Sequence, residues 1–194
     1  MTTSHYIAGR WVEGLGSDCI TVNDPSLGQP FAELMAASVA QVDQAVAAAR
    51  EALPAWKQVS ASARARYLRG FADQLGQRRE ALIALQMRNN GKPRHEAEID
   101  LDDAVATFVY YADLAEQLPQ KNCDVPLAAP GFTARTRLEP VGVVGLIVPW
   151  NFPLVTSAWK LAPALAAGCT VVLKPSEVTP LIEQAYGQIA ETLG

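Results

Sequence analysis

Asn151 is the residue of this chain whose type and setting point most directly to chemistry. It lies between Pro149 and Pro153, which restrict the backbone on both sides of it. A side-chain amide that is held rigidly at the end of a strand suits an oxyanion hole, because a donor that need not reorganise stabilises developing negative charge best. The alternative is an asparagine that only bonds the backbone of its own turn. The residue alone leaves both interpretations open.

A second turn further along the chain contains Lys174 and Glu177. An acidic residue near the end of the second strand of a dinucleotide-binding sheet accepts hydrogen bonds from ribose hydroxyls, so this turn suits a nucleoside. The chain has neither Gly-x-Gly-x-x-Gly nor the P-loop sequence, so the glycine-rich loop that usually binds the pyrophosphate is missing. The alternative to a nucleoside site is that Lys174 and Glu177 are ordinary turn residues before a helix.

The apolar pattern predicts the elements that position these two turns. Residues 141–148 form a nearly continuous apolar run, which is typical of a strand covered on both faces in a parallel sheet. A helix is expected over residues 154–167, a second strand over 170–173, and a last helix from Thr179 and Pro180. A right-handed crossover of this kind brings both turns to the carboxyl edge of the sheet, where open α/β sheets bind ligands.

The preceding part of the chain predicts short strands and turns followed by a layer of helices. Strands and turns are expected over residues 1–37, and Ser38 with Gln41 forms a capping-box pattern that opens a helix ending near Lys57. Three more helices are predicted: one from Ser60 or Ser62, one that stops at residues 89–91, and one over about 94–119. Residues 120–139 read as a linker and a polar strand that leaves the domain body.

Composition limits the classes of partner. The 194 residues carry 16 Lys and Arg against 20 Asp and Glu, a net charge of −4, and 49% are hydrophobic, which suits a globular protein with a sizeable core. Nucleic-acid and membrane partners are not expected, because no basic cluster and no apolar run of ~18 residues is present. The start of the chain shows no signal peptide, so a cytoplasmic location is expected. Cys19, Cys123 and Cys169 suggest no disulfide framework.

Motifs around both turns add specificity to these interpretations. They are residues 148–153 (VPWNFP), 159–168 (WKLAPALAAG) and 173–177 (LKPSE), supported by residues 7–11, 23–25, 90–93 and 137–143. Together they resemble the NAD(P)-dependent aldehyde dehydrogenase superfamily over essentially the whole chain. The resemblance implies an α/β fold, the amino-terminal part of the aldehyde dehydrogenase fold, with a Rossmann-like parallel sheet, a helical layer and a projecting oligomerisation hairpin. In that family the cofactor lies over the strand ends without the glycine fingerprint.

The resemblance also implies a division of the chain. Residues 1–119 would be the amino-terminal strands and helices of the cofactor-binding domain, and residues 120–140 the linker and projecting oligomerisation strand. Residues 141–194 would be the first β-α-β-α part of the NAD-binding sheet, truncated before the catalytic domain. A homodimer or homotetramer is expected for the full-length protein.

Site residues are carried over from the family by matching motif. Asn151 would supply the oxyanion amide, and Lys160 resembles a lysine used in a charge relay by the betaine aldehyde branch, although a solvated helix lysine is the alternative. The cofactor positions would be Val148, Pro149, Trp150, Lys174, Pro175, Ser176 and Glu177. The carboxylate of Glu177 favours NAD over NADP, because it would repel a 2′-phosphate.

The predicted substrate contacts are two acids and two rings. Asp100 and Asp103 are three residues apart on one helix, in a stretch that resembles betaine aldehyde and ω-aminoaldehyde dehydrogenases, and would receive a cationic aldehyde. Alternatively, the acids merely favour the positive end of their own helix. Phe152 and Trp159 match the rings that line the family's substrate tunnel, where a ring face can bind an ammonium group. General aldehyde dehydrogenases carry the same pair.

A monovalent cation is a further implied ligand. In the family it is held through backbone carbonyls, and the matching positions are Val22, Asn23, Asn89 and Val178. The position of Asn89 is often an aspartate in the family, and the loss of that carboxylate leaves the cation less well neutralised.

The expected reaction is the NAD(P)-dependent oxidation of an aldehyde, betaine aldehyde or an ω-aminoaldehyde, to a carboxylic acid by the full-length protein. The family's nucleophilic cysteine and general-base glutamate match no residue of this chain, which is expected to be inactive alone. Two alternatives stay open. They are a general aliphatic aldehyde dehydrogenase and a non-catalytic fragment that binds nucleotide or partner subunits.

Overall fold

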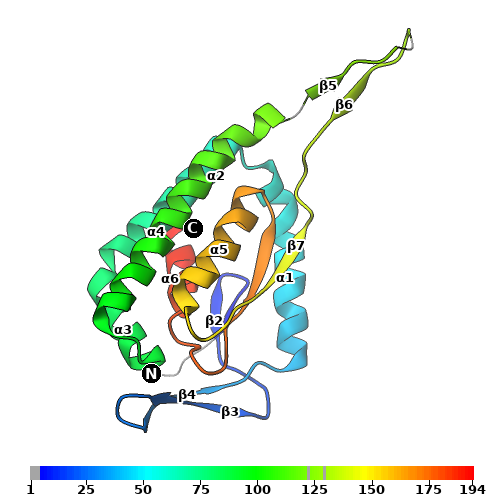
Figure 1. Ribbon diagram of the computed structural model, residues 1–194. Helices are drawn as coiled ribbons and strands as arrows, with labels where there is room; N and C mark the ends of the chain where they lie inside the picture. Colours follow the sequence, from blue (N-terminus) through cyan, green and yellow to red (C-terminus); the bar gives the residue numbers. More distant parts are fainter. Residues whose placement is uncertain (1–4, 122, 129) are drawn as a thin grey trace.

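The computed structural model describes residues 5–121, 123–128 and 130–194, so parts of the predicted first strand region and linker, residues 1–4, 122 and 129, lie outside the described residues. The chain has an α/β architecture in which a small parallel sheet lies between helix α1 on one side and helices α5, α4 and α2 on the other (Figure 1). A thin hairpin projects from this body (Figure 1).

The amino-terminal segment forms two antiparallel hairpins, as its turn residues predict. β1 (His5–Ile7) pairs with β2 (Arg10–Val12), and the turn between them is made by Ala8 and Gly9, both with positive φ. β3 (Cys19–Asp24) pairs with β4 (Gln29–Met35), and a register shift at Val22 and Asn23 interrupts the ladder. Such a shift bends the strand locally.

The four predicted helices are confirmed, with bounds close to those expected. The first is α1 (Val39–Gln58), and its capping box is formed: the Ser38 side chain accepts from the Gln41 N–H and the Gln41 side chain accepts from the Ser38 N–H. The others are α2 (Ala61–Gln77), α3 (Arg79–Asn90) and α4 (Arg94–Gln117). Gly91 ends α3 in the left-handed conformation, which its missing side chain permits.

The predicted projecting strand is part of a hairpin. After a short 3-10 helix (Leu118–Lys121), β5 (Cys123–Val125) pairs antiparallel with β6 (Ala134–Thr136). The hairpin extends far from the helices (Figure 1). Phe132, which lies between its two strands in the sequence, is exposed. The sequence pattern missed β5, because three exposed residues give no apolar alternation.

The predicted crossover is confirmed. β7 (Val143–Ile147) and β8 (Thr170–Lys174) pair in parallel and are joined by α5 (Pro153–Ala166). The register sets Ile147 opposite Lys174, so both strands end at the same edge. The prediction that the first strand is covered on both faces is wrong for this chain, because Leu146 is buried whereas Ile147 is 70% exposed.

The last helix starts later than predicted. α6 spans Gln184–Leu193, whereas a helix from Thr179 and Pro180 was expected. The reason is a partner outside the segment: the Leu181 N–H donates to the side-chain oxygen of Asn89 on α3 at 3.2 Å. The residues before α6 are thereby tied to α3 and form turns.

One main core joins the helical layer to the sheet. Its buried residues come from α2, α3, α4, α5 and α6 and include Leu146 of β7. The Phe71 and Phe108 rings stack at 5.1 Å between centroids, and the Tyr186 ring lies 5.9 Å from that of Phe108. Residues on both sides of the hairpin thus build one packed interior, and the predicted division at residues 119 and 140 stays a prediction.

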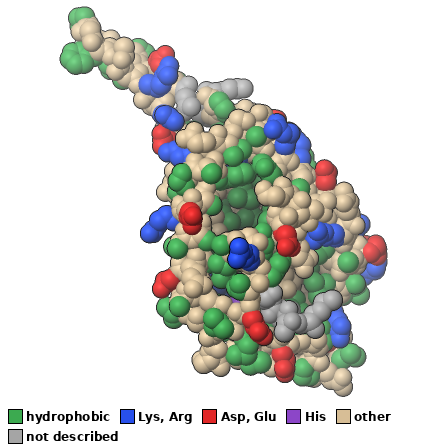
Figure 2. All heavy atoms as spheres, turned by 180° about the vertical axis from the view of Figure 1, so that it is seen from behind, with side chains coloured by type: hydrophobic (Ala, Val, Ile, Leu, Met, Phe, Trp, Pro, Cys, Tyr) green, Lys and Arg blue, Asp and Glu red, His purple; other side chains and the backbone are tan. Residues whose placement is uncertain are grey.

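Two surface properties bear on the predicted partners. On the face shown in Figure 2, Lys and Arg side chains are interspersed with Asp and Glu side chains. None of the helices in the described part of the chain is long and apolar enough to cross a membrane.

Candidate active site

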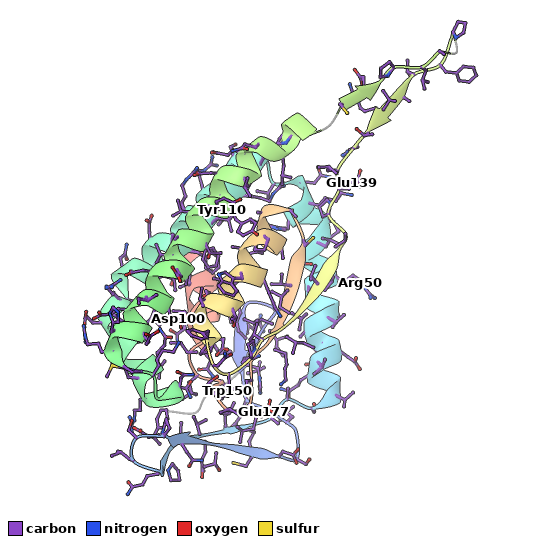
Figure 3. The ribbon with its side chains drawn as sticks, viewed as in Figure 1. Arg50, Asp100, Tyr110, Glu139, Trp150 and Glu177 are labelled. Carbon is purple, nitrogen blue, oxygen red and sulfur yellow. The ribbon has the colours of Figure 1, made fainter. Side chains whose placement is uncertain are left out.

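The two predicted turns lie next to each other at the carboxyl edge of the parallel sheet. β7 continues into Val148, whose backbone N–H donates to the Lys174 carbonyl at 3.3 Å. Trp150 and Glu177, one from each turn, lie near this edge (Figure 3). The structure therefore brings the candidate oxyanion residue and the candidate nucleoside residues to one place.

The backbone on both sides of the Asn151 Cα is held from another helix. The Asn90 side-chain amide donates to the Trp150 carbonyl at 2.7 Å and to the Asn151 carbonyl at 3.1 Å. The Thr179 hydroxyl donates to the same Trp150 carbonyl at 3.4 Å. Asn151 is exposed, and its side chain makes no hydrogen bond to the residues that the structure describes. The Asn151 side-chain amide is thus not used to bond its own turn. This disfavours the alternative of an asparagine that only bonds the backbone of its own turn.

Lys160 lies on α5, where its ammonium group donates to the Ile147 carbonyl at the end of β7. The side chain is exposed and is attached to the strand that leads to Val148. It is therefore more than a freely solvated lysine, and its part in a charge relay stays a prediction.

The second turn presents an ionised pair to solvent. The Lys174 ammonium lies 2.9 Å from the Glu177 carboxylate, and both side chains are exposed. A hydrogen bond from its own backbone and the contact with Lys174 lower the pKa of the Glu177 carboxyl. Ser176 is buried, and its hydroxyl accepts from the Val178 N–H at 3.2 Å, which fixes the turn between the strand and Glu177.

The remaining cofactor positions differ in exposure. Val148 is buried, Pro175 is half-buried, and Pro149 is exposed. Trp150 is 55% exposed, so one part of its ring is open to a ligand at the sheet edge.

A surface hollow of about 430 Å³ lies between α4 and α5, and its lining residues are Asp103, Ala106, Thr107, Tyr110, Tyr111 and Trp159. The Tyr110 and Tyr111 rings meet edge to face at 5.2 Å between centroids. Figure 3 shows Tyr110 on α4 beside α5. One carboxylate and three aromatic rings thus share one hollow, and the structure brings the predicted substrate residues Asp103 and Trp159 together there.

The prediction that Asp100 receives the substrate beside Asp103 is wrong in this structure. The Asp100 side chain is buried, lies 2.9 Å from the Lys92 ammonium and accepts from the Val155 N–H at 3.2 Å. Burial raises the pKa of the Asp100 carboxyl, although the hydrogen bond from Lys92 opposes the rise. Three residues along α4 change the direction of a side chain by about 60°. That rotation separates the buried Asp100 from the exposed Asp103.

Phe152 was predicted to line the substrate site together with Trp159, but the structure separates the two rings. Phe152 is 42% exposed, but the Lys92 ammonium lies over its ring, 4.3 Å from the ring centroid. The ring face already binds a cation from this chain, and Phe152 does not line the hollow that holds Trp159. The predicted pair of rings is thus split between the Asn151 turn and the hollow.

A model of the aldehyde dehydrogenase family matches residues 11–194. This chain belongs to the aldehyde dehydrogenase family. The family resemblance expected from the motifs around Asn151 and Glu177 is thereby confirmed.

Named aldehyde dehydrogenases are similar to this chain over nearly all of its length. It is 42% identical to aminoaldehyde dehydrogenase 2 of Solanum lycopersicum and 39% identical to the chloroplastic betaine aldehyde dehydrogenase of Beta vulgaris, with 97% of this chain covered in both. It covers 38% and 39% of those two proteins. The chain therefore spans about two fifths of the curated relatives that it matches, and the predicted cytoplasmic location stays a prediction beside a chloroplastic relative.

Solved aldehyde dehydrogenases share the fold. A betaine aldehyde dehydrogenase from Staphylococcus aureus in complex with NAD+ superposes with a TM-score of 0.94 at 34% identity, over 100% of this chain and 40% of that one. An aldehyde dehydrogenase from Burkholderia cenocepacia, described as putative, superposes with a TM-score of 0.92 at 40% identity, over 98% of this chain and 39% of its own. The fold predicted as the amino-terminal part of the aldehyde dehydrogenase fold is confirmed.

The cation site expected from other aldehyde dehydrogenases stays a prediction. Val22 and Asn23 lie at the register shift in β3, Asn89 is buried at the end of α3, and Val178 is exposed after β8. The side-chain oxygen of Asn89 accepts from the Leu181 N–H, so its side chain already ties α3 to the segment before α6.

Glu183 is a buried carboxyl that the sequence interpretation missed. It directly precedes α6, and both side-chain oxygens lack a hydrogen-bond partner among the described residues. Burial raises the pKa of Glu183 to about 8, and the nearby charge of Asp100 adds to the rise. No local sequence pattern indicates this, because the burial of Glu183 depends on how distant parts of the chain pack around the start of α6.

Glu183 is expected to make stability depend on pH. The carboxyl is protonated in the folded protein up to pH of about 8, whereas it ionises near 4.5 when unfolded. The stabilisation that the protonated Glu183 gives to the folded state is therefore complete below the unfolded pKa and is lost as pH rises through the folded pKa. The free energy of unfolding should fall by about 2–5 kcal/mol over this range. In urea unfolding at several pH values, Glu183→Gln should flatten this decline and exceed the wild type in stability above pH 8.

The matched control is Glu80→Gln, because Glu80 is exposed on α3 and pairs with Arg94. This control should keep the wild-type decline. If the stability of Glu183→Gln fell with rising pH as steeply as that of the wild type, another group would be responsible for the pH dependence.

Proposed function

We propose that this chain is the amino-terminal part of an enzyme that oxidises an aldehyde to a carboxylic acid with NAD, and that the aldehyde carries an amino or ammonium group. The observation that supports the reaction is the meeting of the Asn151 turn and the Lys174–Glu177 turn at one sheet edge. Bound NAD supplies the hydride acceptor. The nucleophile and the general base come from outside this chain.

Asn151 would act on the carbonyl oxygen of the aldehyde. As a nucleophile adds to the carbonyl carbon, that oxygen gains negative charge and accepts a hydrogen bond from the Asn151 amide. A donor whose backbone is held in advance need not reorganise at that moment. The hydrogen bonds from Asn90 and Thr179 to this turn supply that rigidity.

Glu177 and Lys174 fit the ribose of the adenosine half of NAD. A carboxylate accepts two hydrogen bonds from neighbouring hydroxyls, and the lowered pKa keeps Glu177 ionised at neutral pH. A 2′-phosphate beside Glu177 would be repelled. We therefore propose NAD rather than NADP as the preferred cofactor, with Val148, Pro149, Trp150, Pro175 and Ser176 completing this edge.

The hollow between α4 and α5 supports the choice of aldehyde. Asp103 offers one negative charge, and the rings of Tyr110, Tyr111 and Trp159 lie around it. Aromatic faces and a carboxylate together attract an ammonium group at short range. The names of the Solanum lycopersicum and Beta vulgaris relatives agree with an amino or betaine aldehyde.

Replacing Asp103 with asparagine tests this substrate class in the complete encoded protein. We expect kcat/KM for an aminoaldehyde to fall about 5–10-fold, equivalent to ~1 kcal/mol for a partly exposed charge. The value for a neutral aliphatic aldehyde of equal length should change by less than about twofold, because no charge is then lost from the contact.

Asp102→Asn is the matched control, since Asp102 is the next residue of α4 and its exposed carboxylate pairs with Arg79. It should leave both kcat/KM values unchanged. Equal losses for both aldehydes in Asp103→Asn would exclude the cation site and favour a general aldehyde dehydrogenase. The absence of any NAD reduction with either aldehyde would exclude the reaction.

The projecting hairpin supports an oligomer. A two-stranded hairpin with an exposed Phe132 has little to stabilise it alone, and exposed apolar residues often mark an interface. We propose that β5 and β6 contact another subunit in a homodimer or homotetramer.

A further inference from the structure

The end of α3 contacts the Asn151 turn more closely than any pattern in the sequence suggests. Asn90 is the last residue of α3, and its side-chain amide donates to two successive carbonyls, those of Trp150 and Asn151. These carbonyls flank the Asn151 Cα. An amide NH2 has two hydrogens, so one side chain satisfies both acceptors and fixes the two peptide planes between which the Asn151 side chain begins.

Asn90 is itself held in position. Gly91 follows it with a φ of +80°, and a Cβ at that residue would lie 2.5 Å from the Pro25 ring. The chain can make this turn only with glycine, because a side chain would be strained and would meet Pro25. The Asn90 amide is therefore presented to the turn from a helix end whose geometry is set.

The residues after Asn90 hold the other end of the same turn. Lys92 lies over the Phe152 ring and pairs with Asp100, which accepts from the Val155 N–H in the first turn of α5. The segment from Trp150 to Val155 is thus contacted at its start by Asn90 at the end of α3, in its middle by Lys92 of the α3–α4 connection, and at its end by Asp100 of α4.

We propose that Asn90 is a positioning residue for Asn151, which it orients through the backbone without contacting the substrate. This inference rests on the proposed function of Asn151. A hydrogen-bond donor must lie within about 0.5 Å of its productive position, and a misplacement of ~1 Å can cost about 10²-fold in rate. Without the two hydrogen bonds from Asn90, the longer contact from Thr179 is the one that would still hold the Trp150 carbonyl among the residues that the structure describes.

The test is a double-mutant cycle on kcat in the complete encoded protein. Asn90→Ala should lower kcat about 10–100-fold, and KM for the aldehyde should change much less. If Asn90 acts through Asn151, the same substitution should have little further effect in an Asn151→Ala background. A merely structural residue would give equal losses in both backgrounds, and that result would overturn the proposal.

A conservative variant keeps the test decisive if Asn90→Ala does not fold. Asn90→Asp has nearly the same shape, but its carboxylate cannot donate to the two carbonyls, so it should show the same loss and the same non-additivity. Hydrogen exchange gives a readout that does not depend on turnover. It should accelerate in residues 149–156 of the Asn90 variants and stay unchanged in α2, whereas no local acceleration would overturn the proposal.

Different results would exclude the function proposed for Asn151 and the function proposed for Asn90. If Asn151→Ala leaves kcat unchanged, the proposed function of Asn151 is wrong. If Asn151→Ala lowers kcat and Asn90→Asp does not, only the positioning by Asn90 is wrong.

Discussion

Replacing Asn151 with alanine is expected to lower kcat of the complete encoded protein by about 10²–10³-fold, the cost of removing one oxyanion-hole donor. The backbone of the turn should stay in place, because Asn90 and Thr179 hold the carbonyls of Trp150 and Asn151 and neither contact uses the Asn151 side chain. The loss should therefore fall on the chemical step. Steady-state kinetics with an aminoaldehyde measures it.

Binding of NAD is the control for this prediction. Because Glu177 and Lys174 form the neighbouring turn, the affinity for NAD should change by less than about threefold in Asn151→Ala. A fall in NAD affinity that accounts for the lost activity would place Asn151 in cofactor binding. A kcat within about threefold of the wild type would exclude the oxyanion function.

Replacing Lys92 with methionine should destabilise the protein by about 3–5 kcal/mol, because it leaves the Asp100 carboxylate buried without its counter-ion. Both side chains are almost completely buried, with 6% of Lys92 and 0% of Asp100 exposed. The variant also loses the cation over the Phe152 ring. Urea unfolding at neutral pH, followed by circular dichroism, measures the change in the free energy of unfolding.

Two further variants separate a buried pair from an ordinary surface contact. Lys92→Met combined with Asp100→Leu removes both charges, and it should recover a large part of the loss. Arg94→Met breaks exposed ion pairs with Glu80 and Glu98 and should destabilise the protein much less than Lys92→Met, because water screens exposed pairs. If Lys92→Met were no worse than Arg94→Met, the buried pair would contribute little to stability.

Local signals in the sequence were sufficient for most elements. Ser38 with Gln41 and Gly91 mark helix ends through hydrogen bonds and backbone conformations that involve only nearby residues. The start of α6 was missed because Thr179 and Pro180 look like a helix start, whereas the deciding contact comes from Asn89, far away in the sequence. Local patterns therefore predict a helix or strand correctly unless a distant side chain forms a hydrogen bond with one of its backbone groups.

The candidate site was predictable where one crossover determined it. Asn151 and Glu177 each follow a strand of the same β-α-β unit, and parallel pairing brings those ends together. The burial of Asp100 was not predictable, because helical spacing relates it to Asp103 but does not say which of the two is buried. The contact of Asn90 with the turn was missed for a similar reason, since it depends on how the end of α3 lies against the turn that precedes α5.

The projecting hairpin leaves the packed core without contributing to it. The core is built from residues on both sides of the hairpin, such as Phe108 and Tyr186, so β5 and β6 lie outside what holds the body together. A substitution within β5 or β6 is therefore expected to alter the proposed contact with another subunit, while it leaves unchanged the sheet edge that carries Asn151 and Glu177.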